Sequence, residues 1–335
     1  DALPISEWPS ERVARLYASL PISRIVWTKA EEALGKDASL FWDAIPPYLI
    51  FDNCQDTETF ASRMLAANRA LDAIGTLAWS VEQGLLIDAS LISESLEGLR
   101  VSELGSTHSY HIGSLLEYLE NTSPGDSLFA LEFRFAATVM DRSDAYIYTR
   151  ISNDPNAFVE VASIACGRHH DSEGRENEID GATRYAVYGR LLAHWIIAPG
   201  TDATGVFSSD VFNEWVERVE SRAEDEKELS FFRHLIGRNL LHAPSSDDFF
   251  IPKSVADYLE SSDDTLNGYS EESINSRGVH YVDPTGKPED DLADAYTDKA
   301  EAAEANGYMR FATTLRKIAR MYRAEAEENR RERDG

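Results

Sequence analysis

The chain has 335 residues, 43% of them hydrophobic, and a formal net charge of -27 at pH 7. A surface this acidic repels phosphate at long range, which argues against nucleic acid and against an anionic membrane as partners. The longest apolar stretch, near residues 191–198, is far shorter than the roughly 18 residues that a membrane-spanning helix requires. The composition therefore predicts a soluble protein without a membrane partner.

Cysteine usage and the start of the chain bear on where the protein works. Only Cys54 and Cys166 occur, and so sparse a pair is no disulfide framework, which favours a reducing compartment such as the cytoplasm. The first residue is Asp1 rather than methionine, and no basic-then-apolar leader follows it. We therefore expect a piece of a larger cytoplasmic protein whose N-terminal module is missing.

Apolar residues recur at helical spacing along the N-terminal half, and turn or capping residues separate the runs. Asp56, Asp88 and Asp154 stand where an N-cap is expected, and Pro155 follows the last of them at the first helical position. The predicted helices cover residues 13–20, 22–34, 40–45, 57–65, 71–83, 89–99, 112–119, 124–139 and 155–165.

Residues 166–181 interrupt this pattern. The segment reads CGRHHDSEGRENEIDG and has no periodic apolar positions, so it is predicted to be a polar loop. We predict that it separates an N-terminal helical lobe, residues 1–165, from a C-terminal helical lobe, residues 182–335.

Helical spacing resumes in the C-terminal half. Trp215 stands in the middle of an apolar stripe that includes Val211, Phe212 and Val219, and we expect it to anchor a core. Residues 261–291 are rich in Ser, Asp, Gly and Asn and are predicted to be a long irregular connection. The predicted helices cover residues 185–196, 211–219, 232–241, 252–259, 292–300 and 311–322.

A succession of short amphipathic helices without a strand signal predicts an all-α fold. Each helical hairpin has one apolar stripe to bury on the next, which is typical of stacked hairpins in a superhelical, solenoid-like array. No strict repeat of the tetratricopeptide or ankyrin kind is present. Two lobes and one continuous array both fit this pattern.

Several segments resemble one protein family in order along nearly the whole chain. They include LPISEWPSERVARLYASLP, FWDAIPPYL, HLIGRNLLHAP, IPKSVADYLE, NSRGV and MRFATTLRKIARMYRAEA. The chain resembles the C-terminal helical region of large, mostly uncharacterised prokaryotic multidomain proteins, some of which are linked to phage defence. The resemblance implies a helical scaffold or sensor that follows an enzymatic or nucleotide-binding module.

The densest group of metal-binding side chains is Cys166, His169, His170 and Asp171. Thiolate, imidazole and carboxylate together suit zinc, and a thiol beside an imidazole also suits nucleophilic catalysis. The spacing matches no known zinc finger, and no third group is apparent to orient the base. The competing interpretation is a solvated loop, and we predict no bound metal and no cofactor.

Two arginine-bearing segments are candidates for binding. Arg277 and Gly278 form a turn that would present a guanidinium group to an anion, but the interpretation we favour is structural, with Arg277 paired to a local carboxylate. Arg316, Arg320 and Arg323 form a basic strip on the last helix, for which ion pairs within the chain are the alternative.

His108 and His111 stand three residues apart near the start of a predicted helix. A helix N-terminus explains them without any ligand.

No phosphate-binding loop, GxSxG elbow or HExxH helix is present. The sequence therefore predicts a non-catalytic scaffold or sensor region for protein–protein or intramolecular recognition. Its partner would be another protein or the missing N-terminal module. The alternative is an enzyme or metal-binding module that uses the loop from Cys166 to Asp171.

Overall fold

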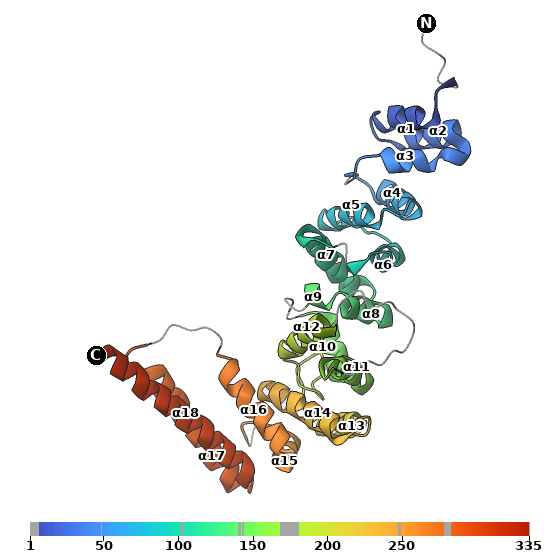
Figure 1. The fold of residues 1–335 in the computed structure, drawn as a ribbon. Coiled ribbons are helices and arrows are strands. Elements are labelled where there is room, and N and C mark those ends of the chain that lie inside the picture. Colours follow the sequence, from blue (N-terminus) through green and yellow to red (C-terminus); the bar gives the residue numbers. More distant parts are fainter. Residues whose placement is uncertain are drawn as a thin grey trace. The chain divides into compact units, whose positions relative to one another are not determined.

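The fold is that of a computed structural model (Figure 1). It describes residues 7–47, 49–101, 104–139, 142, 144–167, 181–246, 249–277 and 283–334. Over these residues the chain forms eighteen α-helices and no strand, with a single isolated bridge between Thr201 and Phe207. None of the described helices is both long and apolar enough to cross a bilayer. The all-α prediction is confirmed, whereas the solenoid-like arrangement stays a prediction.

The chain divides into two compact units, and the first ends at Tyr146. Its helices are α1 (Ser10–Ala18), α2 (Arg24–Leu34), α3 (Ser39–Ala44), α4 (Cys54–Ala66), α5 (Ala70–Glu82), α6 (Ala89–Glu97), α7 (Ser106–Thr122), α8 (Asp126–Arg134) and α9 (Ala136–Val139). Aromatic rings from α2, α3 and α4 form one cluster, in which the Trp27 ring centroid lies 5.8 Å from that of Trp42 and 6.3 Å from that of Phe60.

Helix α5 lies inside this first unit. It contacts α4, α6 and α7, and every residue from Ala73 to Ala78 is buried. A run of six buried residues covers more than one face of a helix, so α5 is enclosed along its middle. Trp79 follows this run directly and is 43% exposed.

The second unit begins at Ile147. Its helices are α10 (Tyr146–Asn153), α11 (Pro155–Ala165), α12 (Gly181–Ala193), α13 (Ser209–Glu220), α14 (Glu226–Asn239), α15 (Lys253–Ser261), α16 (Asp263–Asn275), α17 (Lys287–Ala305) and α18 (Met309–Asp334). In its core, the Phe158 ring lies 5.2 Å from Trp195, 5.1 Å from Trp215 and 5.7 Å from Phe232, measured between ring centroids.

This division differs from the predicted boundary at residues 166–181, of which residues 168–180 lie outside the described part. Residues 147–165, expected in the N-terminal lobe, belong to the second unit, where they form α11 and most of α10, a helix that was not predicted. Phe158 of α11 packs among its aromatic rings, and the Ser163 hydroxyl donates to the buried Glu228 carboxylate of α14 at 2.7 Å. These long-range contacts leave no signal in the local sequence pattern.

The prediction of an irregular segment over residues 261–291 is wrong for most of its length, because it contains α16 and the start of α17. Ser262 caps α16 by accepting from the Asp264 amide at 3.1 Å. Leu266 and Tyr269 are buried within the helix. Many of the small and polar residues that suggested a loop lie within these helices, and Gly268 has a packing role.

That role is a close crossing of α14 and α16. A Cβ added to Gly237 would lie 2.1 Å from the carbonyl oxygen of Thr265, and one added to Gly268 would lie 2.0 Å from that of His234. Two backbones can approach this closely only where both helices lack a side chain. The glycines therefore fit the crossing and do not break the helices.

Several predicted caps are confirmed and one is wrong. The carboxylates of Asp88 and Asp154 accept from backbone amides at the starts of α6 and α11. Helix α4, however, starts earlier than expected, and Asn53 is its cap, accepting from the Asp56 amide at 2.9 Å. Asn and Asp are similarly good caps, so sequence alone did not discriminate between them. Likewise, the helix expected at 124–139 begins at Asp126 and is interrupted at Phe135.

Candidate functional site

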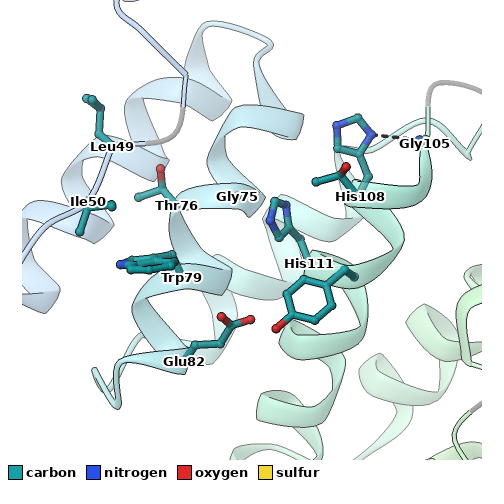
Figure 2. A pocket seen from close by; sticks show the side chains of 11 residues that line it. Leu49, Ile50, Gly75, Thr76, Trp79, Glu82, Gly105, His108 and His111 are labelled. Carbon is teal, nitrogen blue, oxygen red and sulfur yellow. Dashed lines mark hydrogen bonds between the residues drawn. The ribbon is translucent and has the colours of Figure 1, made fainter.

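A pocket that combines aromatic, carboxylate and imidazole side chains lies in the first unit, between α5 and α7 (Figure 2). Its volume is about 760 Å³, within the range of ligand-binding pockets. It is lined by Leu49, Ile50, Gly75, Thr76, Trp79, Glu82, Gly105, Thr107, His108, Tyr110 and His111. Because α5 is a central helix of this unit, one wall of the pocket is fixed by core packing.

Helical spacing brings the polar and aromatic residues of each wall to one face. Thr76, Trp79 and Glu82 follow one another at intervals of three on α5, and His108 and His111 do the same on α7. His111 of α7 lines the same pocket as Trp79 and Glu82 of α5, and Figure 2 shows His108 beside Gly105 at the start of its helix. The histidines explained from sequence as a helix start therefore both line a pocket.

His108 is held by the start of its own helix. The Gly105 amide donates to Nδ1 of His108 at 3.0 Å, so a neutral His108 ring carries its proton on Nε2. This bond satisfies an amide that has no partner within the helix. It also leaves the Nε2 end of the ring as the hydrogen-bond donor.

Burial sets the charge state of His111. Desolvation lowers the pKa of His111 below its ordinary value of 6.5, the Glu82 carboxylate opposes this shift, and His108 adds to it. The ring is therefore neutral at pH 7. The Glu82 carboxylate is oriented by the Ser114 hydroxyl, which donates to Oε1 at 2.9 Å.

The pocket combines exposed apolar groups with an unsatisfied polar one. Ile50 and Tyr110 are each 63% exposed, and Trp79 is 43% exposed. The Thr76 hydroxyl is fully buried and has no hydrogen-bond partner within the described part of the chain. A buried hydroxyl without a hydrogen-bond partner lowers the free energy of unfolding by about 1–3 kcal/mol. A ligand group that bonds to this hydroxyl would recover part of that free energy.

The group of candidate metal-binding residues lies largely outside the described part of the chain, which includes Cys166 but not His169, His170 or Asp171. Cys166 is half-buried at the end of α11. It lines a second pocket of about 450 Å³ with residues of α14 that include Lys227 and His234. No group of three or more metal-binding side chains occurs in the part of the chain that the structure describes.

Arg277 contacts carboxylates of the chain itself. Its guanidinium donates to the buried Glu289 at 2.7 Å and to Glu325 at 3.3 Å, and it lies over the Tyr322 ring. The side chain is only 17% exposed. These contacts agree with the structural alternative for Arg277. Gly278 lies outside the described residues, and an anion-binding turn stays a prediction.

We expect Arg277→Gln to lower the free energy of unfolding by about 2 kcal/mol, because it leaves the buried Glu289 carboxylate without its charged donor. Arg320→Gln is the matched control, since Arg320 is exposed and donates only to the Arg316 carbonyl among described atoms. Urea unfolding of both variants measures the difference. Equal stability of the two variants would contradict a structural role for Arg277.

The basic strip on α18 is exposed and faces α17 in part. Arg316 pairs with Glu304, and Arg323 lies 3.3 Å from a carboxylate oxygen of Asp294. Exposed pairs of this kind contribute little to stability. An acidic partner would compete with Glu304 and Asp294 for these arginines. A binding role for the strip therefore stays a prediction.

The α5–α7 pocket was not predicted from the sequence. One signal was present: Trp79 lies outside the apolar stripe of its helix formed by Leu71, Ile74 and Ala78. A large aromatic residue out of phase with the stripe points away from the core, and a glutamate follows it three residues later.

No protein-family model matches this chain, and no curated protein or solved structure is detectably similar to it. The resemblance to the helical region of prokaryotic multidomain proteins therefore stays an expectation.

Proposed function

We propose that this chain is a non-catalytic recognition module, of the scaffold or sensor kind, that binds a protein partner through the α5–α7 pocket. The observation that supports this most directly is the exposure of Trp79 in a pocket with Ile50 and Tyr110 at its rim. Tryptophan and tyrosine dominate the residues that contribute most to binding energy at protein interfaces.

The electrostatic character of the chain supports recognition of a protein over recognition of nucleic acid. A net charge of -27 keeps polyanions away, and the pocket offers apolar surface together with one carboxylate. Fixed walls favour binding, because a preformed site loses little conformational entropy when its partner arrives.

The proposal predicts that Trp79→Ala weakens binding of the native partner by roughly 30-fold or more, which corresponds to about 2 kcal/mol. The parent and the variant are immobilised side by side in extract from the cells that make the protein. A protein retained by the parent alone is then purified and titrated against both by calorimetry.

Leu86→Ala is the matched control for this experiment. Leu86 is 80% exposed in the same unit but does not line the pocket. We expect this variant to bind like the parent. A purified partner that binds Trp79→Ala as tightly as the parent would show that the recognition surface lies elsewhere.

A further inference from the structure

The charges that line the pocket suit a cationic ligand group. None of the described lining residues is Lys or Arg, and the fixed charge among them is the Glu82 carboxylate. His111 is neutral at pH 7, so it does not offset that charge. An anionic group would be repelled by Glu82, and a purely apolar group would cover the carboxylate without a counter-charge.

The aromatic groups in the same pocket favour one kind of cation. Arginine stacks its planar guanidinium on aromatic faces and forms paired hydrogen bonds to carboxylates, whereas the lysine ammonium is compact and strongly hydrated. Trp79 and Glu82 are three residues apart on α5 and line the same pocket (Figure 2). Residues at this spacing are neighbours on a helix surface, which allows a single guanidinium to contact both.

A second, independent observation is the Thr76 hydroxyl. It is buried, lines the pocket, and lacks a hydrogen-bond partner in the described residues. Thr76 precedes Glu82 by six residues on α5, about 9 Å along the helix axis, which is farther than one guanidinium spans. Its hydroxyl is therefore an acceptor for a neighbouring donor of the bound segment.

We propose that the pocket selects its partner through an arginine side chain, stacked on Trp79 and paired with Glu82. This inference rests on the proposed recognition function and adds the chemistry of the partner. The partner is a protein segment that carries this arginine, because the pocket is larger than one side chain and the exposed Ile50 and Tyr110 remain for flanking residues.

The test uses a library of random peptides displayed on phage. Peptides are selected on the parent protein and depleted on Trp79→Ala, so the survivors depend on the pocket. We expect arginine to be enriched at one position. Replacing that arginine by citrulline, which keeps the shape but removes the charge, should weaken peptide binding at least tenfold. A peptide with lysine at this position should regain only part of the lost affinity.

Glu82→Gln tests the residue that would pair with the guanidinium. This substitution should weaken binding of the arginine peptide about tenfold and leave binding of the citrulline peptide unchanged. Glu97→Gln, an exposed carboxylate of the same unit outside the pocket, should leave both unchanged. Thermal melting of each variant confirms that the fold is retained.

The outcomes separate the two proposals. Pocket-dependent peptides with apolar anchors and no cation would overturn the arginine inference while supporting recognition by the pocket. An arginine peptide that binds Glu82→Gln and the parent equally would also overturn the inference. If no selected peptide depends on Trp79, both the inference and the proposed function fail.

Discussion

Replacing Gly268 with alanine is expected to lower the free energy of unfolding by roughly 3 kcal/mol, at the upper end of the cost of overpacking a core. The added Cβ would lie 2.0 Å from the His234 carbonyl oxygen, which is backbone and has no rotamer to change. Relief requires α14 and α16 to move apart. Alanine in an ordinary helix interior has the opposite effect, a gain of about 0.5–1 kcal/mol over glycine.

Gly189→Ala provides the matched control in the same unit. Gly189 lies in α12, and a Cβ built there meets no atom within 4 Å. We expect this variant to be as stable as the parent or slightly more stable. Urea unfolding of both variants tests the crossing, and a Gly268→Ala protein with the stability of Gly189→Ala would show that the two helices do not meet at this glycine.

Trp215→Ala is expected to destabilise the second unit by about 3–5 kcal/mol, the usual range for removing a buried tryptophan. The residue is 3% exposed, as its apolar stripe predicted, and its ring packs against Phe158 of α11 and Trp195. Truncation therefore opens a cavity where three segments meet.

Val211→Ala is the control on the same helix. The sequence stripe included Val211, but this residue is 50% exposed, so that part of the prediction is wrong. Its replacement should change stability by no more than about 0.5 kcal/mol. If Trp215→Ala unfolds at the same urea concentration as Val211→Ala, the aromatic cluster does not hold the unit together.

Local sequence rules predicted most helices because one apolar stripe and one cap suffice to define each. They failed where packing partners decide the outcome. Gly268 was predicted to lie in a loop, since its packing partner Gly237 lies far along the chain. Phe158 was predicted to belong to the first lobe, because nothing near it in sequence indicates its contact with Trp215. Val211 lies at the edge of its stripe, where burial depends on the neighbouring helix.

Local sequence rules could not predict the candidate site for the same reason. Trp79 and His111 lie on different helices, and only the packing of α5 against α7 brings them to one pocket. Arg277 illustrates the converse case, in which a residue singled out by its turn motif contacts Glu289 of the chain itself. A sequence motif identifies a side chain, whereas the tertiary structure decides what that side chain contacts.

The unequal burial of the tryptophans has an optical consequence. Four of the six indoles are almost fully buried, namely Trp27, Trp42, Trp195 and Trp215. Trp8 is half-buried beneath the Arg12 guanidinium, so Trp79 is the indole most open to solvent. Acrylamide should quench its fluorescence ahead of the buried indoles. A ligand that covers the pocket would protect this emission and shift it to shorter wavelength, which makes occupancy measurable without an added label.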